Sequence, residues 1–403
     1  MVAKAEYRYG VFIPMKGKVL LFVATAMLSA CGGSSSSTSS EYDLCSQLTA
    51  GGFSCSAMVK NLYSQQQSRI ANFAQQVETL RTDVTSYCQA VDNGLNQAAT
   101  RATAQASFEQ AALIWQQLDV MQFGALNSDT RDQFYTYPTR VSCPVNGSIA
   151  SGGALGATPD QRGLTALEYI LYSDEPRGCS DALPDASDPQ KRCDYGLKVA
   201  EQLVLDTQAL QADAAAYQPS LGQPQQEVQQ IFNGLLYVYN ETKEAKLQKS
   251  ILPEKQDDRF KASALEYPVA DINRAAIEAN LIAASVLFNG DSGSGLADLL
   301  VAAGQDGLAG EMTSSLQRAL SASESQQFSE SWRSILTGAD SDPFDNDVDA
   351  CLAAPADAAS DSSQLVRLCS LSKKIDDFSD YLKGPLALTL SLRVPGNVED
   401  DGD

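Results

Sequence analysis

The segment at residues 162–172 reads RGLTALEYILY and says more about the fold than any other stretch of the chain. A helix with about 3.6 residues per turn places its three leucines and Ile170 on one side. The opposite side is polar and aromatic, and it comprises Gln161, Arg162, Thr165, Glu168, Tyr169 and Tyr172. Arg162, Thr165 and Glu168 are three residues apart, so their side chains can converge. This face is a candidate binding site; the alternative is an internal Arg–Glu pair on a solvated or interdomain face.

The rest of the chain is also typical of helices. Ala, Gln, Leu, Ser and Glu are abundant, and no long alternating strand pattern is present. Helices are predicted at 57–90, 95–124, 159–173, 190–217, 224–250, 261–289, 296–303, 307–321, 324–337 and 361–383, with long loops at 125–157 and 338–360. A Pro/Gly break near residue 220 separates two groups of helices. We therefore expect an all-α protein of two packed helical bundles, 57–220 and 221–392, with an acidic tail at 393–403.

The N-terminus has the pattern of an exported protein. Lys16 and Lys18 precede an apolar run at 19–27, which is shorter than the about 20 residues that span a bilayer. The run ends in Leu-Ser-Ala-Cys at 28–31, which resembles the bacterial lipobox. We expect a signal peptide at 1–30, with Met15 as an alternative start, a lipid on Cys31, and a Ser/Gly-rich tether at 31–56. Gly32 favours the periplasmic face of the outer membrane; an ordinary cleavable signal is the alternative.

The cysteines indicate disulfides in an oxidising compartment. Of the nine cysteines, eight remain when Cys31 is set aside, which is an even number. The sequence contains no Cys-x-x-Cys pair, so disulfides are expected rather than a metal site. Their pairing does not follow from the sequence, but closeness along the chain favours four bonds. These are Cys45–Cys55, Cys88–Cys143, Cys179–Cys193 and Cys351–Cys369.

The composition excludes several classes of function. A formal charge of −21 makes nucleic acids and anionic lipid surfaces poor partners. The chain contains no histidine, which excludes Ser-His-Asp and Cys-His catalysis and zinc proteases of the His-Glu-x-x-His type. Metal ligands would have to be oxygens, which suit hard cations such as Fe(III), Ca²⁺ or Mg²⁺.

Several stretches resemble the imelysin-like family. Residues 162–172 are similar to its signature helix with the motif G-x-H-x-x-E: Gly163 and Glu168 match, and Thr165 replaces the histidine. Trp115–Gly124 resembles the family's tryptophan helix, and Tyr137-Pro138 resembles the Trp-Pro that follows it. Glu266–Gly290, which includes Asn280, is similar to its acidic helix. The resemblance extends from about residue 57 to 390.

This resemblance implies two helical bundles with the family's site between them. The family is classed among peptidases and is also connected with bacterial iron uptake, often as periplasmic or lipid-anchored proteins. Because the motif histidine is replaced, we expect ligand binding more than peptide hydrolysis.

The resulting hypothesis is a cell-envelope lipoprotein that binds iron, another hard cation or a chelate in the cleft. No cofactor is certain. Glu168 and Glu266 would supply carboxylates, Tyr169 and Tyr172 phenolates, and Thr165 a hydroxyl; Arg162 and Trp115 could contact an organic ligand. Glu241 and Glu244 could join them, unless they lie on a helix surface with Lys243, Lys246 and Lys249. The alternatives are an accessory lipoprotein that docks on an outer-membrane transporter and, third, a peptidase.

Overall fold

A computed structural model describes residues 43–138, 142–156, 158–173, 183–251, 260–339, 346–359 and 362–395. These ranges contain helices and no strand, which confirms the all-α prediction. The predicted signal peptide, Cys31 and the tether up to residue 42 lie outside the described residues, as do residues 396–403 of the predicted acidic tail. No helix within the described ranges is long and apolar enough to cross a membrane.

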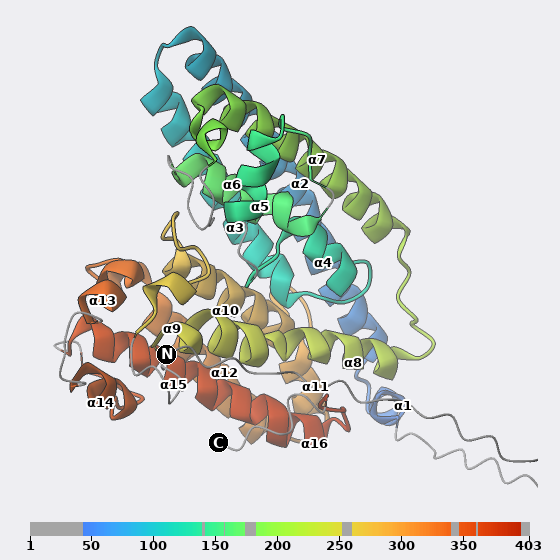
Figure 1. Cartoon of the computed structure of the whole chain (residues 1–403). Helices are drawn as coiled ribbons and strands as arrows, with labels where there is room; N and C mark the ends of the chain where they lie inside the picture. Colours follow the sequence, from blue (N-terminus) through green and yellow to red (C-terminus); the bar gives the residue numbers. More distant parts are fainter. Residues whose placement is uncertain are drawn as a thin grey trace, which may run out of the picture. The chain divides into compact units, whose positions relative to one another are not determined.

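The first group of helices is built around one very long helix. It comprises α1 (Leu44–Ala50), α2 (Cys55–Asn93), α3 (Gln97–Val120), α4 (Ser128–Phe134), α5 (Ser142–Ala150), η1 (Pro159–Gln161), α6 (Gly163–Tyr172), η2 (Pro184–Ser187) and α7 (Pro189–Ala216). The Ser54 side chain accepts the N–H of Ala57 and caps the start of α2, and Gly94 ends it in the left-handed conformation. In Figure 1, α2, α3 and α7 lie side by side, and α6 packs on α7.

The second group follows a Pro/Gly-containing connection. It comprises α8 (Pro224–Leu235), the π-helix η3 (Val238–Gln248), α9 (Lys249–Ile251), η4 (Ala262–Ala264), α10 (Asn273–Asn289), α11 (Leu296–Ala302), α12 (Asp306–Ser323), η5 (Ser325–Gln327), α13 (Trp332–Ala339), α14 (Asn346–Leu352), α15 (Gln364–Tyr381), the π-helix η6 (Leu382–Leu386) and α16 (Ala387–Thr389). Within it, α12 packs against α15 and α10.

Two hydrophobic cores underlie these groups. One contains Phe73, Phe108 and Trp115, and the other contains Phe288, Leu316 and Phe378. The start of α2 belongs to the second core, because Met58, Val59 and Leu62 are fully buried there. Helix α2 therefore connects the two cores. The predicted bundle boundary at residue 220 stays a prediction, since the chain from residue 42 onward forms one compact unit.

Several predicted elements differ from the observed ones. The helix predicted at 261–289 begins only at Asn273; before it, residues 265–272 form a loop that Asn273 holds by accepting the N–H of Tyr267 and donating to its carbonyl. The helix predicted at 159–173 is interrupted at Arg162, whose backbone is extended. Residues 43–56, assigned to the tether, form α1 and the start of α2. The predicted loops 125–157 and 338–360 contain α4, α5 and α14.

The observed disulfides agree with two of the four predicted pairs and contradict the other two. Cys45–Cys55 and Cys351–Cys369 are bonded as expected. Cys88, however, is bonded to Cys193, so the predicted pairs Cys88–Cys143 and Cys179–Cys193 are wrong. Closeness along the chain misled because α2 and α7 pack along their lengths and bring residues 105 positions apart together. Cys143 is also disulfide-bonded.

Candidate functional site

A cavity of about 450 Å³ lies between α6 on one side and the η4 loop and α13 on the other. Helix α6 contributes Thr165 and Glu168, and the loop after η4 contributes Glu266. Two cations, Lys249 and Arg333, also line it, and both are exposed. The cavity wall therefore carries two carboxylates and two cations, which suits a polar ligand with charged groups.

The motif glycine positions α6 against the first core. Gly163 has φ +83°, a left-handed conformation that side chains other than glycine rarely adopt. A Cβ atom here would lie 2.6 Å from the carbonyl oxygen of Phe134. Only glycine therefore allows the chain to turn into α6 this close to α4, which places Thr165 and Glu168 at the cavity.

Glu168 connects α6 to the loop across the cavity. It is 4% exposed, and its Oε1 accepts the backbone N–H groups of Ala270, at 2.9 Å, and Val269, at 3.2 Å. Hydrogen bonds to a carboxylate contribute about 1.5–3 kcal/mol each. Glu168 thus holds the loop that carries Glu266.

Glu266 lines the cavity from the loop after η4. It is 4% exposed, and its Oε1 accepts hydrogen bonds from the Tyr135 hydroxyl, at 2.7 Å, and Gln116 Nε2, at 2.9 Å. The same oxygen pairs with Lys246 Nζ at 2.9 Å. Its second oxygen, Oε2, is buried and has no hydrogen-bond partner within the described part of the chain. A buried acceptor without a donor is costly, so a ligand donor or cation that reached this atom would be stabilised there.

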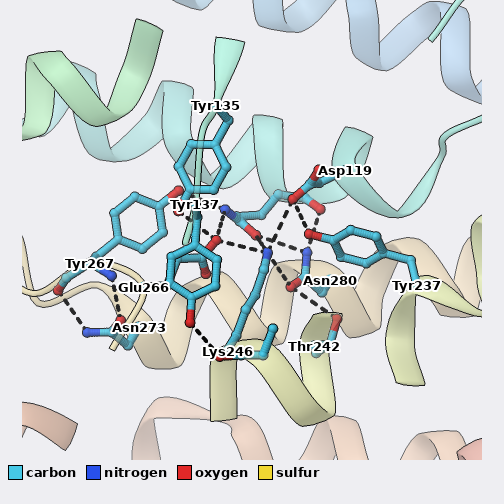
Figure 2. A network of polar contacts seen from close by, with 12 residues as sticks. Asp119, Tyr135, Tyr137, Tyr237, Thr242, Lys246, Glu266, Tyr267, Asn273 and Asn280 are labelled. Atoms are coloured by element: carbon cyan, nitrogen blue, oxygen red, sulfur yellow. Dashed lines mark hydrogen bonds and ion pairs between the residues drawn. The ribbon is translucent and has the colours of Figure 1, made fainter. Parts of the chain in front are cut away.

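Behind Glu266 lies a buried network of charges that joins α3, η3 and α10 (Figure 2). Lys246 Nζ contacts Asp119 Oδ2 at 3.3 Å and Asn280 Oδ1 at 3.2 Å, in addition to Glu266. Lys246 and Asp119 are almost completely buried. Removing one partner of such a buried ion pair typically lowers the free energy of unfolding by about 3–5 kcal/mol. The network therefore strongly constrains the position of Glu266.

Asp119 is held ionised inside this network. Burial by itself would raise the pKa of Asp119, but the positive charges of Arg131 and Lys246 outweigh burial and hold that pKa below its usual value. Arg131 Nε donates to Asp119 Oδ1 at 2.7 Å, and the Tyr237 hydroxyl donates to Oδ2. The pKa of Glu241, by contrast, is raised above its usual value, and burial is the largest cause.

The tyrosines of the network are held neutral. Burial, together with the negative charge of Glu266, raises the pKa of Tyr135 and Tyr267 well above its ordinary value. Burial and Asp119 do the same for Tyr237. A phenol held protonated donates a hydrogen bond and is a poor metal ligand at neutral pH. Tyr135 and Tyr237 therefore position carboxylates. The Tyr267 hydroxyl instead accepts a hydrogen bond from Gln116 Nε2 at 2.7 Å.

The structure brings together part of the predicted site. Thr165, Glu168, Tyr169 and Glu266 all line the cavity. Thr165 lies 3.0 Å from the hydroxyl of Thr136, and the Tyr169 hydroxyl hydrogen-bonds the side chain of Asn146.

Three predicted residues lie elsewhere. Arg162 does not line the cavity, and its charge acts instead on Asp206 of α7. The Tyr172 hydroxyl contacts Glu109 at 3.0 Å, and burial first, then Glu109, raises its pKa. Trp115 is fully buried in the first core with Phe73 and Phe134, so it does not contact the cavity.

Sequence reasoning missed most of the network. Gln116 and Asp119 lie within the tryptophan stretch quoted for its family resemblance, and Tyr267 follows Glu266 directly, but no spacing pointed to their roles. The interpretation of Lys243 and Lys246 as surface charges is wrong, because both are buried and only Lys249 is exposed. The many charges between residues 241 and 249 suggested a surface, but they lie on a π-helix, whose residues face different directions from those of an α-helix.

A bare metal ion needs several ligand atoms that converge on one point. Within the described residues, no group of three or more His, Cys, Asp or Glu side chains is arranged to hold one. One oxygen of Glu168 and one of Glu266 are already engaged with donors. A hard cation such as Ca²⁺ takes about six to eight oxygen ligands. The described residues around the cavity therefore do not form a site for a bare ion.

The fold and cavity define an all-α protein with two hydrophobic cores and a cavity lined by residues from both groups of helices. The sequence matches the family model described as Peptidase_M75, Imelysin, over residues 67–360. The chain therefore belongs to the imelysin family. A search of curated protein sequences found no significant match.

Two solved structures share the fold at low sequence identity. One is from Parabacteroides distasonis ATCC 8503 and is described as an iron-regulated protein A precursor; it is 17% identical, has a TM-score of 0.51, and the match covers 81% of this chain and 95% of that one. The other is an imelysin-like protein from Psychrobacter arcticum 273-4, 15% identical with a TM-score of 0.51, over 85% of this chain and 98% of that one.

Proposed function

We propose that this protein binds a small, anionic organic ligand in the cavity between α6 and the η4 loop, and that the ligand is the chelate of a hard cation such as iron. The observation that carries this proposal is the buried, unpartnered Oε2 of Glu266, a residue of the cavity lining. The link to iron is supported by the family and by the solved structure described as iron-regulated.

A chelate agrees better with the cavity than a bare ion does. A chelator supplies most of the cation's oxygen ligands itself, so the protein needs no cluster of carboxylates. The exposed Lys249 and Arg333 can meet the negative groups of a chelator, with Arg333 able to bind a carboxylate in a bidentate manner. Glu266 Oε2 can accept a hydrogen bond from a hydroxyl of the ligand.

Calorimetric titration of the protein lacking residues 1–31 tests this proposal. Ferric citrate should bind saturably, whereas Ca²⁺ alone should not. Arg333→Gln should weaken ferric citrate binding about tenfold, equivalent to about 1.4 kcal/mol. This variant changes an exposed residue, so its thermal stability should equal that of the unaltered protein. Absence of ferric citrate binding in the stable wild-type protein would refute the chelate proposal.

Glu266→Gln provides the second variant. It preserves the shape of the side chain but removes its charge, so it tests the contribution of the Glu266 carboxylate to ligand binding. Because Glu266 pairs with Lys246, the change could destabilise the fold. The circular dichroism spectrum and melting temperature of the variant are therefore measured first. We expect a folded variant of lower stability with weakened ligand binding.

We further propose that Cys31 anchors the protein by a lipid to the periplasmic face of the outer membrane, on the basis of the Leu-Ser-Ala-Cys motif. Metabolic labelling with a fatty acid should mark the wild-type protein and leave Cys31→Ser unlabelled. Equal labelling of both proteins would contradict the lipid anchor.

A further inference from the structure

A second pocket, of about 300 Å³, lies between α12, the η5 turn and α15. It shares no residue with the cavity described above. Helix α12 contributes Arg318, and α15 contributes Arg367 and Lys374, which are seven residues apart and therefore lie on one face of the helix. This pocket is thus a separate feature of the second group of helices.

The charge of this pocket is opposite to that of the protein. Its lining contains three cations and no carboxylate, in a chain whose formal charge is −21. The remaining lining is mostly polar, with Gln317, Gln327, Ser321 and Ser370 beside two alanines. The pocket therefore combines positive charge with polar side chains that can form hydrogen bonds, which favours a small anion.

Two of the cations could bind an anion: one has an N–H without an acceptor in the described part of the chain, and the other is paired with an exposed aspartate. Arg367 Nε is buried and has no hydrogen-bond partner among the described residues. The Lys374 side chain is only 12% exposed, and its ion-pair partner Asp357, at 2.5 Å, is 84% exposed. A buried guanidinium N–H without an acceptor is unfavourable, so an anion that reaches Arg367 would gain a charge-assisted hydrogen bond.

We propose that this pocket binds a phosphate group of a small molecule or free phosphate. Arg318, Arg367 and Lys374 approach from two helices, and a tetrahedral oxyanion presents oxygens in several directions, whereas a carboxylate presents two in one plane. Asp357 acts as an internal competitor for Lys374. This site is independent of ligand binding in the cavity.

Titration calorimetry of the purified protein with inorganic phosphate and with glycerol 3-phosphate at low ionic strength tests the proposal. We expect saturable binding that weakens at least tenfold in Arg367→Gln and that weakens with added NaCl. Asp357→Asn should bind more tightly, because it removes the competing carboxylate. Arg333→Gln, which alters the other cavity, is the matched control and should bind phosphate like the wild type.

Lipid vesicles distinguish the source of the phosphate group. Vesicles of phosphatidylcholine with phosphatidic acid should sediment the wild-type protein only if the pocket accepts a lipid headgroup, and Arg367→Gln should then stay in solution. No saturable binding of either soluble phosphate would overturn the proposal, and so would equal binding by wild type and a folded Arg367→Gln. Loss of phosphate binding in Arg333→Gln alone would assign the anion to the cavity and would also overturn it.

Discussion

Single residues at the cavity show how the family motif works in a chain without histidine. Glu168 accepts two backbone N–H groups of the loop that carries Glu266, so it acts mainly as a structural connection. Thr165 occupies the position of the motif histidine, and its hydroxyl lies against Thr136. Among the described residues that line the cavity, Glu266 has a buried carboxylate oxygen without a hydrogen-bond partner. The residue that we expect to contact the ligand thus lies opposite the motif helix.

Gly163 gives a prediction about stability. Gly163→Ala should destabilise the protein by about 1–3 kcal/mol, because alanine would be strained at φ +83° and its Cβ would clash with the Phe134 carbonyl. Urea unfolding measures the difference. Gly310→Ala on α12 is the control, since its Cβ would meet open space. This substitution should leave the free energy of unfolding unchanged or increase it. Equal stability of Gly163→Ala and the wild type would contradict the observed backbone conformation.

Glu241 gives a prediction about pH. Burial raises its pKa, so its charged form is penalised in the folded state at any pH above that raised pKa. Glu241→Gln should therefore stabilise the protein at pH 7, by on the order of 1 kcal/mol. The gain should shrink as the pH falls and vanish below the ordinary glutamate pKa of about 4.3, where both states are protonated. Thermal melts between pH 4 and 8 measure it; a gain that grows on acidification would contradict this sign.

At the scale of elements, periodicity predicted the long helices but not their interruptions. The bounds of α2, α3 and α7 lie within a few residues of the prediction because their apolar residues repeat regularly and caps mark their ends. The segment before Asn273 was predicted as helix, yet it forms the loop that places Glu266 and Tyr267. That loop depends on contacts with Glu168, about 100 residues away, and such contacts leave no periodic signal.

The same limit applies to the site. A motif helix could be recognised from its own residues, so Thr165, Glu168 and Tyr169 were found. The network of Asp119, Lys246 and Asn280 joins three helices distant in sequence, and only the folded chain shows that they meet. Burial of a lysine is particularly hard to infer, because most lysines lie on surfaces.

The Cys88–Cys193 bond gives a prediction at this scale. It joins α2 to α7, so Cys88→Ser with Cys193→Ser should lower the free energy of unfolding by about 2–5 kcal/mol. Denaturant unfolding measures that loss. Mass spectrometry of a digest under non-reducing conditions should recover a peptide pair with Cys88 and Cys193. A pair that contains Cys88 and Cys143 would contradict the connectivity.

At the scale of the whole molecule, two hydrophobic cores share one long helix and are joined by a buried polar network. The residues that line the cavity come from segments 137–173 and 249–337, which belong to both groups of helices. A change in how these groups pack would therefore alter the cavity directly. The ion pairs of Lys246 with Asp119 and Glu266 restrict such changes, which agrees with a preformed binding site.

One measurement tests directly whether this cavity is the binding site. Thr337 lines it from α13 and is exposed, so Thr337→Trp should fill the cavity without disturbing either core. Thr103→Trp, at an exposed position on α3, is the matched control. Titrated with ferric citrate, Thr337→Trp should bind at least tenfold more weakly than the wild type, whereas Thr103→Trp should bind equally well. Undiminished binding by a stable Thr337→Trp would contradict the assignment of the site to this cavity.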